Sequence, residues 1–271
     1  MINFFKYNSS GNDFIIIDNR EKKIQLKVSE IRKMCDRNFG VGADGLILLE
    51  SHEKVNYFMN YFNSDGLPST LCGNGSMCCG HFASILGLLE KIDNHYIGVF
   101  NTREGDFDVQ VLYNLVTISM PNVSIKHNTQ FITVNNEKGI YINTGSPHYL
   151  LIKSNLENFN IYKNVIRIKE SSVFKEEGVN VTFVEINKEN LFIRTYERGV
   201  EDETLSCGTG VVAAALLQSI ISKDNKDIVK KIKTRGGIFN VDYSFNEKQQ
   251  LFEDISLSNK VNLVFKGTYH F

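Results

Sequence analysis

The sequence has few prolines, few cysteines and no long run of apolar residues. Three prolines, at 68, 121 and 147, and no low-complexity segment interrupt its 271 residues, so a folded globular protein is expected. No stretch approaches 18 consecutive apolar residues, which argues against a membrane-spanning helix. The five cysteines are an odd number in a long chain, and such a count does not describe a disulfide framework.

The charge balance is nearly neutral. Lys plus Arg is 30 and Asp plus Glu is 31, giving a formal net charge of −1. This excludes the overall positive charge that is typical of nucleic-acid-binding proteins. The N-terminal residues show no basic region followed by an apolar run, so we expect no secretory signal and a cytoplasmic location. In that reducing compartment, a cysteine with a special role is expected to be reactive rather than cross-linked.

Short runs rich in Val, Ile, Phe and Tyr, bounded by Gly, Asn or Asp, predict strands. They are 13–18, 45–49, 57–62, 109–118, 149–152, 181–186 and 191–196. Helical patterns are fewer, at 29–35 and at two long apolar segments, 75–89 and 210–221. A helix that is apolar on most sides is usually buried. The sequence therefore predicts an α+β fold with central helices wrapped by strands.

The sequence repeats itself at an offset of 134 or 135 residues. The matched segments are 11–14 with 145–148, 62–66 with 196–199, and 72–75 with 207–210. Three matches in the same order predict two similar halves. We expect an N-terminal α/β half over 1–120 and a C-terminal one over 121–258, with the last strands, from about 259 to 271, returning to the first half.

The third match is a Cys-Gly-x-Gly motif before each long helical pattern, beginning at Cys72 and at Cys207. The first N–H groups of a helix lack internal partners and lie at the positive end of the helix dipole. Such an end binds anions and lowers the pKa of a nearby thiol. Each half is thus expected to offer one reactive cysteine and one cradle for a carboxylate.

Two thiols that face one carbon atom from opposite sides suit inversion of configuration. One thiolate removes a proton from a carbon α to a carboxylate, and the opposite thiol delivers a proton to the other face. The carbanion must be stabilised by oriented N–H groups in a dry cavity. If an approximate two-fold axis relates the halves, Cys72 and Cys207 are expected to face a shared cleft between them.

Eight short motifs, in this order, make the chain resemble the diaminopimelate epimerase family from residue 6 to about 240. They are Gly11-Asn12-Asp13-Phe14, Gly40-Val41-Gly42-Ala43-Asp44-Gly45, Phe62-Asn63-Ser64-Asp65-Gly66, Cys72-Gly73-Asn74-Gly75, Pro147-His148, Asn180-Val181-x-Phe183-Val184, Tyr196-Glu197-Arg198-Gly199 and Cys207-Gly208-Thr209-Gly210. The resemblance implies a proline racemase-like fold of two halves with the active site in the cleft between them.

The resemblance also implies an activity. The family interconverts LL- and meso-2,6-diaminopimelate in the bacterial route to lysine and cell-wall peptide. It uses two cysteines as acid and base, with neither pyridoxal phosphate nor a metal. The resemblance then implies two partners, a small amino-acid substrate and a second copy of the chain in a homodimer. Neither nucleic acid nor a membrane is expected as a partner.

Site residues follow from the resemblance by position. Cys72 and Cys207 correspond to the acid–base pair, and Glu197 and His148 to residues that support the amino group and the thiols. Backbone groups at Gly73, Asn74, Gly208 and Thr209 correspond to the binders of the α-carboxylate. The remaining substrate-binding positions are Asn12, Asn63, Ser146, Asn180 and Arg198, and the Arg198 fork matches the distal carboxylate.

The chain departs from the family pattern at three places. Ser146 stands where the family commonly has an Asn that binds the distal end of the substrate. The loop after Gly199 is one residue longer, and Ser76-Met77-Cys78 replaces Ala-Arg-Cys, losing a cation. These changes concern the distal contacts more than the proton transfers. The acidic run 201–203 is interpreted as a solvated loop.

Other interpretations of the glycines and cysteines remain. Cys35, Cys78 and Cys79 are expected to be core residues, although Cys79-Gly80-His81 matches the setting of a catalytic cysteine in proline racemases. A metal site formed with Cys72 lacks the usual Cys-x2-Cys spacing, and a dinucleotide site at 208–213 lacks a strand that runs into it. A non-enzymatic binder would not need both cysteines. A racemase of proline or hydroxyproline is the main alternative.

Overall fold

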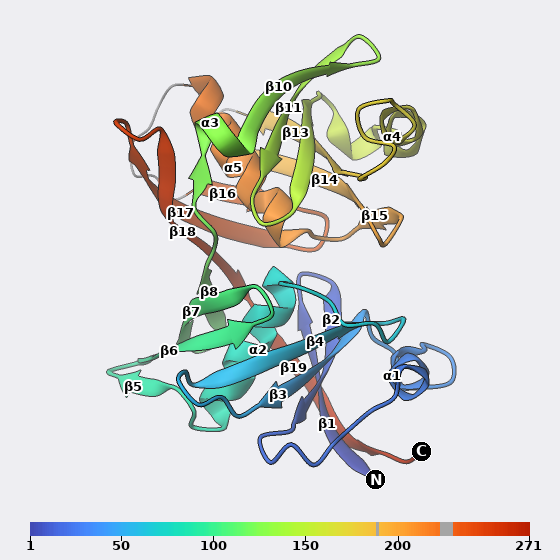
Figure 1. Ribbon diagram of the computed structural model, residues 1–271, viewed down its shortest axis with the longest axis vertical. Coiled ribbons are helices and arrows are strands. Elements are labelled where there is room, and N and C mark those ends of the chain that lie inside the picture. Colours follow the sequence, from blue (N-terminus) through green and yellow to red (C-terminus); the bar gives the residue numbers. More distant parts are fainter. Residues whose placement is uncertain (188–189, 223–229) are drawn as a thin grey trace. The chain divides into compact units, whose positions relative to one another are not determined.

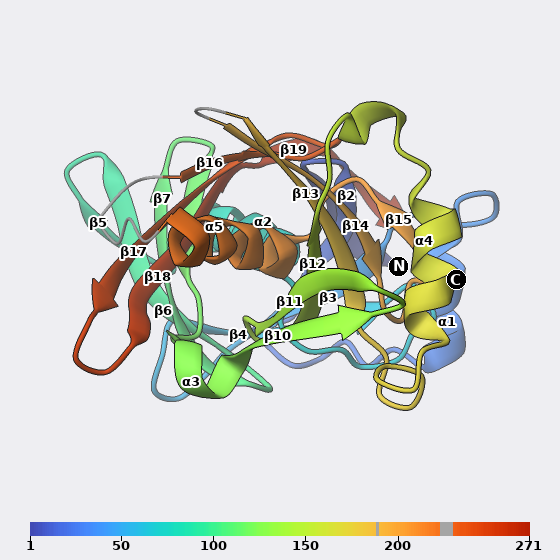
Figure 2. The same ribbon diagram turned by 90° about the horizontal axis from the view of Figure 1, so that it is seen from above.

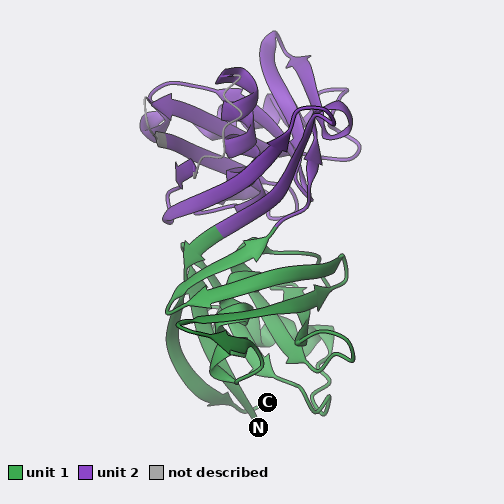
Figure 3. Ribbon diagram, turned by 90° about the vertical axis from the view of Figure 1, so that its left-hand side faces the viewer, with its two compact units in different colours: residues 1–119, 258–271 green, residues 120–257 purple. Residues whose placement is uncertain are grey.

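The computed structural model describes residues 1–187, 190–222 and 230–271. The chain divides into two compact units, unit 1 (1–119 with 258–271) and unit 2 (120–257), which are coloured separately in Figure 3. Each unit contains strands and a few helices, so the predicted α+β class is confirmed. Within the described residues, no helix combines the length and the apolar character needed to cross a bilayer.

Unit 1 is built on a mixed set of strands. Its elements are β1 (Ile2–Ser9), β2 (Asn12–Asp18), α1 (Val28–Cys35), β3 (Gly45–Glu50), β4 (Tyr57–Asn63), α2 (Gly73–Ile85), β5 (Glu90–Ile92), β6 (His95–Thr102), β7 (Gly105–Leu112) and β8 (Leu115–Ser119). β1 and β2 form a hairpin, β2 runs parallel to β3, β3 antiparallel to β4, and β4 parallel to β6. β6, β7 and β8 continue as an antiparallel meander.

The helix α2 lies at the centre of unit 1 (Figure 1). It contacts β1, β2, β3, β4, β7 and β8, and its side chains from Met77 to Cys79 are fully buried. Gly80 allows this close approach, because a Cβ atom there would lie 2.6 Å from Cγ2 of Val109 on β7. An apolar helix surrounded by strands on several sides therefore forms the core of the unit.

Unit 2 has the corresponding elements. They are β9 (Val123–Ser124), α3 (Ile125–Asn128), β10 (Thr129–Val134), β11 (Glu137–Asn143), β12 (Pro147–Ile152), η1 (Leu156–Asn158), α4 (Ile161–Lys169), β13 (Asn180–Asn187), β14 (Asn190–Glu197), β15 (Asp202–Thr204), α5 (Gly208–Ser222), β16 (Lys230–Lys233), β17 (Ile238–Asn246) and β18 (Leu251–Lys260). The helix α5 contacts β11 to β14, β16 and β17, among which it lies in Figure 2.

The two units share one order of strand pairing. In unit 2, β11 is antiparallel to β12, β12 parallel to β13, β13 antiparallel to β14, and β14 parallel to β16. This repeats the series from β1 to β6, and each central helix connects the last antiparallel pair to the next parallel strand. The repeated segments of the sequence therefore fall at equivalent points of two similar folds.

The C-terminal strand belongs to unit 1. β19 (Asn262–Tyr269) pairs antiparallel with β1, with Ile2 opposite Tyr269. The end of β18 also lies in unit 1, where the hydroxyls of Ser258 and Thr117 are 2.9 Å apart. The first unit is thus assembled from both ends of the chain.

Two sequence-based boundaries are wrong. Residues 109–118 form parts of two strands, because the chain turns between β7 and β8 at Tyr113, whose φ is 55°. The helix expected over 75–89 begins at Gly73 and ends at Ile85. Gly87 ends it with a φ of 71°, and the Leu88 N–H donates to the Ala83 carbonyl at 3.0 Å, which is a Schellman motif.

Candidate active site

Each candidate cysteine lies at the start of its unit's central helix. The backbone N–H of Ser76 donates to the carbonyl of Cys72 at 2.8 Å, and that of Val211 donates to the carbonyl of Cys207 at 2.9 Å. These are the first i to i+4 bonds of α2 and α5, so the amides in between have no acceptor within their own helix. Neither helix has an acidic residue in its first turn, so its positive end is not neutralised from within.

In unit 1, the half-buried Cys72 lies beside Asn12, at the start of β2. Its Sγ is 3.7 Å from Oδ1 of Asn12, which also accepts from Nδ2 of the buried Asn74 at 3.5 Å. The fold thus brings together three of the residues that the sequence assigned to the site. Asn12 presents a carbonyl oxygen to the thiol.

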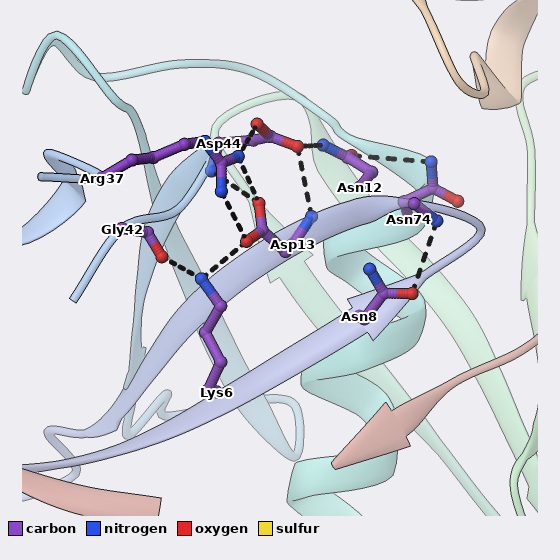
Figure 4. A network of polar contacts seen from close by, with 9 residues as sticks. Lys6, Asn8, Asn12, Asp13, Arg37, Gly42, Asp44 and Asn74 are labelled. Carbon is purple, nitrogen blue, oxygen red and sulfur yellow. Dashed lines mark hydrogen bonds and ion pairs between the residues drawn. The ribbon is translucent and has the colours of Figure 1, made fainter. Parts of the chain in front are cut away.

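A charged network lies behind Asn12 (Figure 4). Nδ2 of Asn12 donates to Oδ2 of Asp44 at 2.6 Å, and Arg37 donates to Asp44 at 2.6 Å and to Asp13 at 2.8 Å. Lys6 donates to Asp13 at 2.6 Å. Burial alone would raise the pKa of Asp13, but the hydrogen bonds and charges of Arg37 and Lys6 outweigh it and lower this pKa to about 2.

In unit 2, Cys207 is linked to a buried imidazole. Oγ1 of Thr209 lies 3.5 Å from Sγ of Cys207 and 2.9 Å from Nε2 of His148, and Nδ1 of His148 lies 2.9 Å from Oγ1 of Thr182. Burial, with a smaller effect of the Arg198 charge, lowers the pKa of His148 to about 3. The ring is therefore neutral near pH 7, and it donates through one nitrogen and accepts through the other.

Gly210 leaves room for this imidazole. A Cβ atom at position 210 would lie 3.1 Å from Cε1 of His148 and 3.1 Å from Oγ1 of Thr195. Thr195 in turn lies 3.1 Å from Oγ1 of Thr182. Side-chain packing within the unit thus favours the second glycine of the motif, and no bound nucleotide is needed to explain it.

Three predicted substrate-binding residues of unit 2 contact one another. Nδ2 of Asn180 donates to Oγ of Ser146 at 2.8 Å, and Oδ1 of Asn180 accepts from the backbone N–H of Arg198 at 2.9 Å. The exposed Arg198 side chain donates from Nη1 to the carbonyl of Glu177 at 2.9 Å. Since a guanidinium has five N–H donors, others remain available for an anion.

Glu197, at the end of β14, accepts a short hydrogen bond from the hydroxyl of Thr204 on β15. The interpretation of 201–203 as a solvated loop is wrong for Glu203. Its side chain is 4% exposed and receives two hydrogen bonds from the buried Arg194, at 2.6 and 2.7 Å, and one from Arg235 at 2.9 Å. This ion pair fixes β15 against β14 and so fixes the partner of Glu197.

Asn63 does not join either group. It ends β4 as an exposed residue, and its backbone carbonyl accepts from the N–H of Gly66 at 2.9 Å in a turn. Among the hydrogen bonds described for residues 1–187, 190–222 and 230–271, none links its side chain to Asn12 or Cys72. Its predicted role in substrate binding stays a prediction.

The remaining cysteines are core residues. Burial raises the pKa of Cys35 to about 12 and also raises the pKa values of Cys78 and Cys79, which are fully buried in α2. The nearby His81 ring lies within hydrogen-bonding distance of Tyr7, at 3.1 Å. Across the described parts of the chain, no group of three or more His, Cys, Asp or Glu is arranged to hold a metal ion.

Three polar residues of the site lie outside the predicted set. Asp44 belongs to the motif over 40–45 but has no predicted role, and Thr182 and Thr195 lie in the predicted strands 181–186 and 191–196. Their signal was a polar side chain in an otherwise apolar buried strand, as in the run of β13, where Thr182 is fully buried. Buried polar groups are usually hydrogen-bonded, so such positions could have been marked.

One family model matches the chain in two segments. This model, described as "Diaminopimelate epimerase", matches residues 4–121 and 140–255. A diaminopimelate epimerase of Flavobacterium psychrophilum is 38% identical over 266 residues, covering 97% of this chain and 98% of the relative. One of Chlorobaculum tepidum is 37% identical, covering 96% and 98%.

Solved structures of other enzymes share the fold. A probable proline racemase from Agrobacterium radiobacter K84 superposes with a TM-score of 0.75 at 14% identity, covering 100% of this chain and 93% of that one. A hydroxyproline epimerase from Agrobacterium vitis gives 0.70 at 13% identity, covering 98% and 91%. These structures confirm the expected proline racemase-like fold, whereas the sequence relatives identify the family. The chain belongs to the diaminopimelate epimerase family.

Proposed function

We propose that this protein interconverts LL- and meso-2,6-diaminopimelate by two-base proton transfer, in the formation of lysine and of peptidoglycan precursors. The proposal is supported by family membership and by one structural observation. Each unit places one cysteine at the start of a long central helix, where the first i to i+4 bond begins at the cysteine itself. Such a position favours a thiolate and an adjacent carboxylate.

The proposed reaction breaks one C–H bond and forms another at the same carbon. The thiolate of one cysteine takes the α-proton and becomes a thiol. The electron pair left on the carbon is delocalised into the adjacent carboxylate, and the thiol of the other cysteine donates its proton to the opposite face. Cys72 and Cys207 exchange roles in the reverse direction, and protons from solvent restore the starting state. No cofactor takes part in these steps.

The α-carboxylate is proposed to bind backbone N–H groups in the first turn of each central helix. The donors are those of Gly73 and Asn74 on α2, with those of Gly208 and Thr209 on α5. Because the negative charge on this carboxylate increases when the α-proton leaves, fixed N–H dipoles stabilise the transition state more than the ground state.

The far end of the substrate is proposed to bind the group formed by Ser146, Asn180 and Arg198. The Arg198 guanidinium supplies a charge opposite to that of the distal carboxylate. Asn180 holds both the Ser146 hydroxyl and the backbone of Arg198. A proline racemase activity is the less favoured candidate, since proline has no second carboxylate and the structures bearing that name share only the fold.

Cys72 and Cys207 can be tested separately by substitution. Cys72→Ser and Cys207→Ser are each expected to reduce epimerisation by roughly 10²- to 10⁴-fold, because serine is a much weaker acid and base near pH 7. The measurement is the rate at which LL-diaminopimelate is converted to the meso form, because one remaining thiolate can exchange the α-proton without inversion. Cys79→Ala is the matched control, since Cys79 is a fully buried residue of α2 and is expected to keep activity. Full epimerisation by either serine variant would contradict the proposal.

Arg198 distinguishes the two substrate classes. Arg198→Met is expected to raise KM for diaminopimelate about tenfold or more, because a charge-assisted hydrogen bond is lost, with a smaller change in kcat. Arg167→Met, which removes an exposed arginine of α4, is the control and should leave KM unchanged. An unchanged KM in Arg198→Met, together with turnover of proline, would support the alternative activity instead.

His148 makes stability depend on pH. Its pKa is about 3 when folded and about 6.5 when unfolded, so the unfolded chain binds the extra proton and stability is lost as the pH falls below 6.5. Between pH 7 and pH 5 this group should remove about 2 kcal/mol from the free energy of unfolding. His148→Gln should flatten this part of the denaturant-measured profile, whereas the exposed His270→Gln should not. An unchanged slope in His148→Gln would contradict the buried neutral ring.

We also propose that the chain acts in the cytoplasm as a homodimer. Leu263, Val264 and Phe265 on β19 are 40 to 57% exposed, and adjacent exposed apolar residues often mark an interface between subunits. Sedimentation should give twice the 30.8 kDa chain mass, and Val264→Lys should shift the protein toward the monomer. A wild-type monomer at micromolar concentration would refute this part.

A further inference from the structure

Asp44 lies between an arginine and the asparagine that faces Cys72 (Figure 4). Its Oδ2 accepts from Nδ2 of Asn12 at 2.6 Å and from the backbone N–H of Asp13 at 3.2 Å, and its Oδ1 accepts from Arg37 at 2.6 Å. Both carboxylate oxygens therefore accept hydrogen bonds, and Oδ2 binds the NH2 group of the Asn12 amide.

The two ends of an asparagine amide differ in chemistry but hardly in shape. One end carries the NH2 donors and the other the carbonyl acceptor, so a half-turn exchanges them. A carboxylate only accepts, and therefore the NH2 end of Asn12 must face Asp44. The carbonyl oxygen must then face the opposite way, where Sγ of Cys72 lies at 3.7 Å and Nδ2 of Asn74 at 3.5 Å.

The protonation of Cys72 depends on which end of the Asn12 amide faces its sulfur atom. A carbonyl oxygen accepts a hydrogen bond from the S–H group and repels a thiolate, whereas an NH2 group would stabilise the thiolate. The start of α2 acts in the opposite direction, since its N–H groups favour the thiolate. A residue that must both give and take a proton needs neither form to be strongly disfavoured.

We propose that Asp44 is a positioning residue, which fixes the Asn12 amide with its carbonyl oxygen toward Cys72 and thereby favours the thiol form of Cys72. The proposal rests on the acid–base role proposed above for this cysteine. Asp44 acts by orienting Asn12, and its negative charge does not act directly on the Cys72 thiol. The same orientation presents an acceptor to the ammonium group of an amino-acid substrate.

Asp44 is itself held in place by its neighbours. Its backbone N–H donates to the carbonyl of Asp13 at 3.0 Å, and Arg37, which also bonds Asp13, spans both carboxylates. The parallel pairing of β2 with β3, in which Phe14 lies opposite Gly45, places the two aspartates side by side. Lys6, Asp13 and Arg37 are the charged groups that face this carboxylate or its partner.

The test measures the rate at which iodoacetamide alkylates Cys72 as a function of pH, without substrate, by peptide mass spectrometry. In Asp44→Ala the amide is free to turn, and we expect Cys72 to react about three- to tenfold faster at pH 7, with the midpoint of its pH profile shifted down. In Asp44→Asn an amide oxygen can still accept from Asn12, so the rate should change less than about twofold. The rate of each variant is compared with that of the wild-type protein under the same conditions.

The two variants separate orientation from charge. If the negative charge of Asp44 acted directly on the thiol, Asp44→Asn would match Asp44→Ala, and the proposal would be overturned. A double-mutant cycle adds a second criterion. In an Asn12→Ala background, Asp44→Ala should alter the Cys72 rate less than about twofold, and a persistent full effect would also overturn the proposal.

Controls address folding and the proposed function. Asp18→Asn removes another arginine-bonded carboxylate of unit 1, at 2.8 Å from Arg20, and should leave Cys72 unchanged. If Asp44→Ala does not fold, Asp44→Ser replaces it, because its shorter side chain cannot span the distance to Asn12.

Epimerisation should fall about tenfold in Asp44→Ala and at most about threefold in Asp44→Asn. If the enzyme epimerises diaminopimelate but Asp44→Ala leaves the pH profile of Cys72 unchanged, only the positioning role is refuted. If Asp44→Ala alters the profile but the wild-type enzyme does not act on diaminopimelate, only the proposed substrate is refuted.

Discussion

The first N–H groups of a helix require partners, and a helix that begins inside a protein has little water to supply them. The structure of both units depends on this constraint. α2 and α5 start among strands, with Cys72 and Cys207 as the residues whose carbonyls accept the first helical bonds. Cys72 provides no side-chain cap for α2. The donors of the first turn therefore have no acceptor within their own helix, and a sulfur atom lies beside them.

The two units surround their cysteines with different chemistry. In unit 1, charged residues stand behind an amide, and the two arginine-bonded carboxylates reach solvent in part. In unit 2, a neutral imidazole and hydroxyl groups are arranged in a fully buried series from Thr182 to His148. Burial explains the difference, because an ion pair loses hydration when it is enclosed, whereas a neutral group only requires hydrogen-bond partners. The repeated fold has thus kept the helix start and changed the side chains that surround it.

Local patterns in the sequence predicted both central helices, each to within two residues of its observed start. The glycines that follow each cysteine, and the apolar residues after them, identify a buried helix without reference to any other part of the chain. Residues that meet through strand register could not be found in this way. Asp13 and Asp44 are neighbours only because Phe14 pairs with Gly45, and Glu203 is buried only because Arg194 faces it from the adjoining strand.

The return of the last strand to the first unit has a consequence for synthesis on the ribosome. Unit 2 is continuous, from 120 to 257, and all of it is translated before β19. Unit 1 lacks the neighbour of β1 until Asn262–Tyr269 has left the exit tunnel. The half translated first therefore keeps an open strand edge, exposed to aggregation, while the whole of the other half is synthesised.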